Sequence, residues 1–399
     1  MTSTLRKDLN LVIEEVSALY HERDTETRMI VTGILAGQHT LLLGPPGTGK
    51  SAIAREITSR IDSGKYWEIL LSKFTAPSAI FGPIDVAALA QGTYRQVFAG
   101  HATEANIAFL DEIFKCSAAA LNSMLAYLNE RVYHPESGGA PIVCPLVSAI
   151  CASNELGEDE ATAALYDRLL IRLEVDYLTE PDAFNALLRS AVRTPADAAP
   201  VRTSVELGDL QAAIATEIPA VALPGAIIEA IRSLRADLAR KEIVSSDRRW
   251  KQAVRVLQAA AWLEGRDEIA ADDLNVLGHV LWDVPTTRPT VRKMIRSYLG
   301  SDQRRIADMR DQLSNIEAEL DKLLAKNEPE TLAAWGIEVN PQLAKIDRSL
   351  KRSLAEAEEA GRPAAVYRQA VEHAQKVFSR VLVHALGVDE SQVPTLGSR

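Results

Sequence analysis

Apolar and polar residues follow two different periods along the first 181 residues. The residues of 5–20 and 24–36 place apolar side chains at helical spacing, whereas Thr40 to Leu43 is a short apolar run typical of a buried strand. The same alternation continues, with strands predicted at 66–71, 107–110, 146–154 and 169–175 and helices at 51–61, 114–131 and 160–168. This order predicts an α/β fold in which helices cover both faces of a parallel sheet.

Two segments interrupt that alternation. A short helix at 85–90 and a strand at 93–98 are expected to stand off the core as an insertion. A small hairpin is expected from Val132-Tyr133 and 141–145, with its turn at Ser137-Gly138-Gly139.

The remaining chain is predicted to be helical. A periodic helix follows the capping residues Ser246 and Asp247 and runs to about Leu263, and another covers 271–282. An a/d heptad stripe then begins, formed by Ile306, Met309, Leu313, Ile316, Leu320 and Leu323. It continues in a second helix at 340–361 and a third from Pro363 to about Leu386. These helices are expected to pack on one another as an antiparallel hairpin or a three-helix bundle. A second interpretation, compatible with the first, is an arm that recruits a partner. The domain boundaries expected are 1–181, 182–285 and 286–399.

Composition narrows the function classes. The 54 acidic residues outnumber the 44 basic ones, for a net charge of −10, which argues against a dedicated nucleic-acid binder. No apolar run approaches the ~18 residues of a membrane span, and the N-terminus lacks a signal-peptide core. The three cysteines form no C-x-x-C pair, so a zinc site or disulfide framework is not expected. A cytoplasmic location is therefore predicted.

A glycine-rich loop follows the first predicted strand and precedes a helix. Its spacing, G-x-x-x-x-G-K-S, is that of a phosphate-binding P-loop, formed by Gly44, Pro45, Pro46, Gly47, Thr48, Gly49, Lys50 and Ser51. The glycines let backbone N–H groups surround an anion at a helix N-terminus. In such loops the lysine reaches the β- and γ-phosphates and the hydroxyl binds Mg²⁺, so ATP and Mg²⁺ are the expected ligands.

Two carboxylates end the next apolar strand. Asp111 is expected to hold Mg²⁺, and Glu112 to orient and deprotonate an attacking water, because ligands bind at the carboxyl ends of parallel strands. Acids at this place also suit a helix N-terminus, but the P-loop some sixty residues earlier favours the catalytic interpretation.

Three further positions are candidate functional sites, and each also has a purely structural explanation. Asn154 ends a buried strand and could contact the γ-phosphate or the water, or cap the next helix. Arg168 could reach a neighbouring subunit's nucleotide, or pair with Asp167 or Asp176. The two arginines at 248 and 249 oppose a helix dipole, which a phosphate or nearby carboxylates would relieve.

These motifs together resemble an AAA+ ATPase of the MoxR family, closest to its RavA branch, over about residues 5–285. The resembling phrases are 81–83 (FGP), 109–113 (FLDEI), 125–131 (LAYLNER), 152–156 (ASNEL), 165–168 (LYDR) and 246–250 (SDRRW). RavA proteins carry a β-rich module among their C-terminal helices, whereas this chain shows only helical heptads after about residue 300.

The resemblance implies an ATP-hydrolysing ring hexamer with a helical lid domain that remodels a client protein, often with a von Willebrand A-domain partner. It implies that Lys50 and Ser51 are Walker A residues and that Asp111 and Glu112 are Walker B residues. It makes Asn154 sensor 1, Arg168 a finger acting on the neighbour, and Arg248, rather than Arg249, sensor 2. A magnesium-chelatase-like motor subunit and a DNA-remodelling AAA+ protein are the alternatives.

Overall fold

The computed structural model describes residues 2–136, 138–157, 160–190, 202–326, 328–359 and 365–389. The chain divides into two compact units, Met1–Ile295 and Arg296–Arg399. Three features expected from the sequence lie outside the described residues: Ser137 of the hairpin turn, Pro363 before the last helix, and the tail from residue 390 onward.

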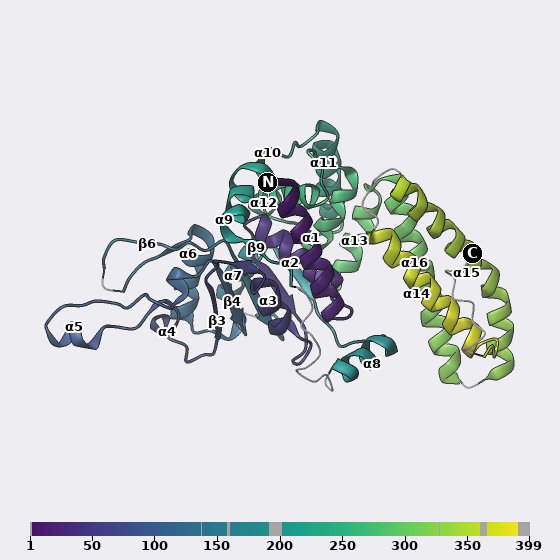
Figure 1. Ribbon diagram of the computed structural model, residues 1–399, viewed down its shortest axis with the longest axis horizontal. Helices are drawn as coiled ribbons and strands as arrows, with labels where there is room; N and C mark the ends of the chain where they lie inside the picture. The colour runs from purple at the N-terminus through teal and green to yellow at the C-terminus, as the bar shows by residue number, and fades with distance from the viewer. Residues whose placement is uncertain are drawn as a thin grey trace. The chain divides into compact units, whose positions relative to one another are not determined.

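The first unit is built on a five-stranded parallel sheet with the order β3-β4-β7-β1-β8 (Figure 1). Its strands are β1 (Thr40–Leu43), β3 (Tyr66–Leu70), β4 (Ile107–Asp111), β7 (Ser148–Ser153) and β8 (Ile171–Glu174). All residues of β1 and β7 are buried, as is typical of parallel strands covered on both faces. Leu43 lies opposite both Ser153 and Glu174, so the strands end at one common edge. The predicted α/β fold is confirmed.

Two helices precede the first strand of this sheet, three longer helices lie in the connections between its strands, and one follows the last strand. They are α1 (Thr2–Leu19), α2 (Asp24–Leu35), α3 (Lys50–Thr58), α6 (Ala118–Glu130), α7 (Glu160–Arg168) and α8 (Pro181–Ser190). The helix expected at 51–61 ends earlier, because Ile61–Asp62 forms β2, which pairs with β9 (Val205–Glu206). The helix expected at 114–131 is also shorter. A 3₁₀ turn occupies Ile113–Lys115, and Ser117 then caps α6 by accepting a hydrogen bond from the Ala120 N–H.

α4 (Pro77–Phe81) leads into the insertion, which contains α5 (Val86–Ala90), and the hairpin contains β5 (Val132–Tyr133) and β6 (Ile142–Val143). Figure 1 shows both extending from the same side of the first unit. The strand expected at 93–98 is wrong: a single bridge joins Gln96 to Ile84. Pro83 cannot donate to a ladder, and Asp85 caps α5 directly after the bridge, so the pairing stops.

The helices after β9 form the rest of the first unit, which is called the helical part below. They are α9 (Leu207–Ala212), α10 (Ile218–Ala220), α11 (Gly225–Ala239), α12 (Asp247–Leu263) and α13 (Arg288–Arg296), with a π-helical turn at Ala213–Glu217 and 3₁₀ turns at Ala271–His279 and Pro285–Thr287. The predicted helix at 271–282 is therefore a shorter 3₁₀ segment. Among the described residues no helix is both long and apolar enough to cross a bilayer.

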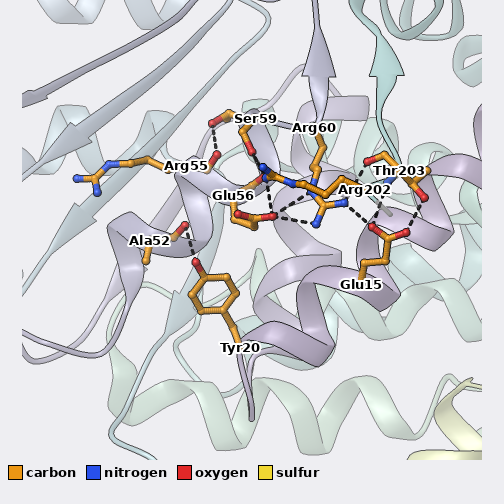
Figure 2. Close-up of polar contacts among 10 residues, drawn as sticks. Glu15, Tyr20, Ala52, Arg55, Glu56, Ser59, Arg60, Arg202 and Thr203 are labelled. Carbon is orange, nitrogen blue, oxygen red and sulfur yellow. Dashed lines mark hydrogen bonds and ion pairs between the residues drawn. The ribbon is translucent and has the colours of Figure 1, made fainter. Parts of the chain in front are cut away.

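A buried arginine joins the P-loop helix to the segment that enters the helical part (Figure 2). Only 2% of the Arg60 side chain is exposed, and it donates to Glu56 Oε1 at the end of α3, to Glu15 on α1, and to the Thr203 carbonyl at 3.2 Å. Glu15 in turn accepts from the Thr203 backbone N–H at 3.1 Å. Arg202 donates to the same Glu56 oxygen at 2.8 Å. The buried charge is thus fully paired, which is the condition for its burial.

The second unit contains three helices around one apolar core. They are α14 (Ser301–Lys326), α15 (Pro329–Glu359) and α16 (Ala365–His384). The predicted heptad positions of α14 are buried, and so are Ile346 and Leu350. The second helix was expected to begin near Asn340-Pro341 but begins at Pro329, with Pro341 inside it. Burial of Leu332 and Val339 on the preceding turns outweighs the local cost of the proline.

The packing of the second unit is testable at Leu350, whose side chain is fully buried. Leu350→Ala is expected to lower the free energy of opening of α14–α16 by about 2–5 kcal/mol, because truncation leaves a cavity. Amide hydrogen exchange across these helices measures that energy. Ile337→Ala on the same helix is the control, because its side chain is 68% exposed. Equal effects of the two substitutions would contradict the assigned core.

Candidate active site

The P-loop conformation explains its three glycines in two different ways. A Cβ on Gly44 would lie 2.0 Å from the Val175 carbonyl oxygen, so only glycine fits against the chain leaving β8. Gly47 and Gly49 have φ values of +81° and +86° and open space around them, so backbone conformation requires glycine there. Gly49 is the N-cap of α3. The loop therefore presents its N–H groups at a helix N-terminus, which favours an anion.

The Lys50 side chain folds back over the P-loop. Its Nζ donates to the carbonyls of Gly44 at 2.7 Å and Pro45 at 2.8 Å, and to Asn154 Oδ1 at 3.1 Å. The Thr48 hydroxyl also donates to the Pro45 carbonyl, at 3.0 Å. Burial lowers the pKa of Lys50, while the carboxylates of Asp111 and Glu112 act in the opposite sense. Those two acids are therefore the charged neighbours of the lysine.

Glu112 has an unusual backbone for a non-glycine residue. Its φ of 54° and ψ of 45° are left-handed, a conformation that costs of the order of 1–3 kcal/mol and often marks functional sites. Its N–H donates to Asp111 Oδ1 at 2.9 Å, and its Oε1 accepts from Asn154 Nδ2 at 2.7 Å.

Asn154 joins the two halves of the site. Its carbonyl oxygen accepts from Lys50 and its amide nitrogen donates to Glu112, so one side chain spans the P-loop and the acidic strand. These bonds connect residues that are 104 and 42 positions from Asn154 in the chain. The structure thus brings together Lys50, Asp111, Glu112 and Asn154, as the sequence predicted.

The donor set fits a magnesium-bound nucleotide. Ser51 stands in the first turn of α3 beside Lys50, and Asp111 is a charged neighbour of that lysine. Within the described ranges, no cluster of three or more His, Cys, Asp or Glu side chains could hold a metal by itself. One hydroxyl and one carboxylate suit Mg²⁺, which usually shares its coordination with substrate phosphates and water.

Arg168 ends α7, where its Nη1 donates to the Ala164 carbonyl at 2.5 Å. Burial is the main cause that lowers its pKa, and the nearby positive charge of Arg248 lowers it further. In the described part of the chain, Arg168 makes no ion pair with Asp167 or Asp176, so the ordinary alternative for this residue is not observed. The Arg248 guanidinium is a like-charged neighbour of Arg168, and the carboxylates of Asp167 and Glu130 act on its pKa in the opposite sense.

The two arginines that begin α12 have different surroundings. Arg249 is buried and donates to Asp283 at 2.6 Å and Asp167 at 3.3 Å, so carboxylates relieve its conflict with the helix dipole. Arg248 is partly exposed and donates to the Asn129 side-chain oxygen at the end of α6. Among the described residues, neither Arg168 nor Arg248 is bonded to Lys50, Asp111, Glu112 or Asn154.

A second buried arginine shares a carboxylate with Arg249, and together they form a junction between β8 and α12. The Arg172 side chain on β8 is completely buried and donates to the same Asp283 oxygen at 2.9 Å, while its guanidinium stacks on the Tyr166 ring at 3.7 Å. The two guanidiniums hold the pKa of Asp283 below its ordinary value, against the effect of burial. The sequence analysis did not single out Arg172 or Asp283, because no local pattern relates them.

The sequence analysis also missed two residues that lie beside the P-loop and Glu112. The Tyr177 hydroxyl donates to the Pro46 carbonyl at 3.4 Å, and Lys115 Nζ lies 3.2 Å from Glu112 Oε2. The position of Lys115 three residues after Glu112 was a usable signal, because such spacing brings side chains together on a helical turn.

Comparisons with known proteins agree with this site. The strand order and the P-loop define a AAA+ ATPase fold, and an AAA lid domain model matches residues 226–295. The MoxR domain of MoxR-vWA-beta-propeller ternary systems matches residues 7–213. The chain belongs to the MoxR family of AAA+ ATPases.

The similar proteins extend over most of the chain. It is 31% identical to the uncharacterized protein MJ0079 of Methanocaldococcus jannaschii over 360 residues, or 89% of this chain and 92% of that protein. It is 32% identical to the uncharacterized protein MJ0812 of the same organism over 278 residues, 69% of this chain and 72% of that protein. The crystal structure of a "putative ATPase" from Cytophaga hutchinsonii matches with a TM-score of 0.59 at 18% identity, covering 74% of this chain and 94% of that one. This last likeness concerns the fold.

The two arginines of α12 should separate in a stability experiment. Arg249→Ala removes a buried cation from two carboxylates and is expected to lower the free energy of unfolding by about 1–3 kcal/mol, a value reduced because both carboxylates are partly exposed. Arg248→Ala should change it by less than about 0.5 kcal/mol. Denaturant unfolding measures both. A larger loss for Arg248→Ala would contradict the assignment of Arg249 as the structural member.

Proposed function

We propose that the protein hydrolyses ATP at the edge of the sheet where β1, β4 and β7 end. The observation that carries the proposal is the connection from Lys50 through Asn154 to Glu112, which joins a phosphate-binding loop to a carboxylate. A phosphate on the loop and a water beside Glu112 would then be neighbours, as phosphoryl transfer to water requires.

Each residue has a definite task in this reaction. The N–H groups of the P-loop bind the phosphates, and Lys50 exchanges its loop carbonyls for β- and γ-phosphate oxygens. Asn154 orients the water, and Glu112 takes its proton as the new P–O bond forms and ADP leaves. Mg²⁺, held through Ser51 and Asp111, would neutralise phosphate charge. These assignments make the loop, both acids and Asn154 one catalytic unit.

The proposed active form is a ring, expected to be a hexamer, with each site completed by a neighbouring copy. Arg168 and Arg248 are electrostatic neighbours of one another, whereas the charged neighbours of Lys50 are Asp111 and Glu112. A guanidinium at the end of α7, with a second guanidinium nearby, suits the negative charge of a phosphate supplied by another subunit, as an arginine finger does. We therefore assign Arg168 as a finger acting on the neighbour's nucleotide, with Arg248 as sensor 2 beside it.

The proposed task of the ring is to remodel or mature a partner protein. The insertion and the hairpin both expose apolar side chains: Val86 at the start of α5 is 77% exposed, and Val143 at the base of the hairpin is 79% exposed. Such side chains suit contact with a protein. The matching family model comes from systems that contain a von Willebrand A component, which supports a partner of that kind. The RavA-like branch and the cytoplasmic location stay predictions.

Catalysis by Glu112 predicts a clear split between binding and turnover. Glu112→Gln should retain ATP affinity and lose hydrolysis by about 10²-fold or more, because the amide cannot take the proton. Fluorescent-nucleotide titration and phosphate release measure the two quantities. Glu155→Gln, at an exposed acid that also lies beside Lys115, is the matched control and should hydrolyse normally. Undiminished turnover in the Glu112 variant would overturn the assignment.

Completion of each site by a neighbour predicts complementation between two inactive variants. Arg168→Ala lacks the finger and Glu112→Gln lacks the base, but a mixed ring contains intact sites where the Arg168→Ala loop meets the other variant's finger. A random equal mixture should recover about one quarter of wild-type activity. Arg232→Ala, at an exposed arginine paired with Glu229, is the control for loss of an arginine. No recovery in rings shown to be mixed would exclude a finger acting between subunits.

A further inference from the structure

Lys115 is placed to control the carboxylate that the proposed reaction depends on. It ends the 3₁₀ turn at Ile113–Lys115, and its backbone N–H donates to the Glu112 carbonyl at 2.8 Å. Its side chain returns to the same residue, with Nζ 3.2 Å from Glu112 Oε2 and 3.9 Å from Glu155 Oε1. The turn thus closes a short loop between one lysine and the catalytic carboxylate.

Both oxygens of Glu112 are engaged in this arrangement. Oε1 accepts the hydrogen bond from Asn154, and Oε2 is shielded from solvent. Within the described residues Oε2 receives no directed hydrogen bond, so its interaction with Lys115 is an ion pair. A general base must present a lone pair to the proton that it takes. Because Oε2 is shielded from solvent, Glu112 can use that oxygen to activate water only after its side chain turns away from Lys115.

We propose that Lys115 is a positioning residue that holds Glu112 in a resting orientation, and that its release precedes hydrolysis. The inference rests on the proposed ATPase function of this site. The Lys115 side chain is 42% exposed, and ion pairs at such positions contribute little stability. The restraint is consequently weak enough to be broken by a small movement of the turn.

The turn is also hydrogen-bonded to the segment that leads into α4 and the insertion. Ser117, two residues after Lys115, caps α6 and donates from its hydroxyl to the Thr75 carbonyl at 2.8 Å. Thr75 precedes α4, and its neighbour Phe74 is 96% exposed. A partner protein that moves this segment would pull on the turn that carries Lys115. Binding of a client protein to this segment would in this way release Glu112 from Lys115.

The test compares steady-state hydrolysis at saturating Mg-ATP in three variants at Lys115. Lys115→Ala and Lys115→Gln are expected to raise kcat about two- to five-fold, the range that loss of a weak ion pair allows, with KM within about two-fold of wild type. Lys115→Arg keeps the charge and should remain close to wild type. Lys65→Ala is the matched control, because it removes a lysine from an exposed ion pair with Glu104, away from Glu112.

Each outcome is decisive. An unchanged or lower kcat in both neutral variants, with ATP affinity intact, would overturn the restraint and show that Lys115 supports catalysis directly or has no role. An Arg variant as fast as the Ala variant would show that charge is not what holds Glu112. Lys115→Ala combined with Glu112→Gln should be inactive. If Glu112→Gln alone hydrolyses ATP normally, the proposed function fails; if it is inactive and Lys115→Ala equals wild type, only the restraint fails.

Discussion

One carboxylate oxygen holds the helical part of the first unit to the sheet. Asp283 Oδ1 accepts from Arg172 on β8 and from Arg249 on α12, and both guanidiniums are almost completely buried. A buried guanidinium without a partner costs several kcal/mol, and loss of Asp283 would take the carboxylate from Arg172 and leave Arg249 with Asp167. Because Arg248 adjoins Arg249, and Asp167 adjoins Arg168, this junction also constrains the positions of the candidate finger Arg168 and the candidate sensor 2 residue Arg248.

The opposite end of the helical part is anchored in the same manner. Arg60 at the end of the P-loop helix binds Glu15 and the Thr203 carbonyl, just before β9. A change in the P-loop helix therefore reaches the entry of the helical part through one buried cation, and a change at α7 reaches its exit through another. Buried ion pairs and hydrogen bonds therefore connect the sheet-containing part of the first unit to both ends of the helical part.

Signals that lie within a few residues were readable from the sequence. The glycine loop, the acids after an apolar strand and the Asn at the end of β7 depend on backbone conformation and on strand ends, so their meeting at one edge follows from the parallel sheet. The role of Arg249 was not readable, since its partners Asp167 and Asp283 lie 82 and 34 residues away. The strand expected at 93–98 failed because Pro83 and the Asp85 cap limit its partner. Pro341 failed as a helix boundary because packing on the adjacent turns outweighed local propensity.

The core of the second unit has an evolutionary consequence. In the part of the chain that the structure describes, its apolar cluster, from Ile306 to Ala385, is formed by α14–α16 and the turn that follows them. A segment whose core is its own can be gained, lost or exchanged by gene fusion without opening the apolar interior of its neighbour. Lineages that share the nucleotide-binding unit can therefore diversify at the C-terminal end while the loop, the acids and the arginines of the first unit stay under separate selection.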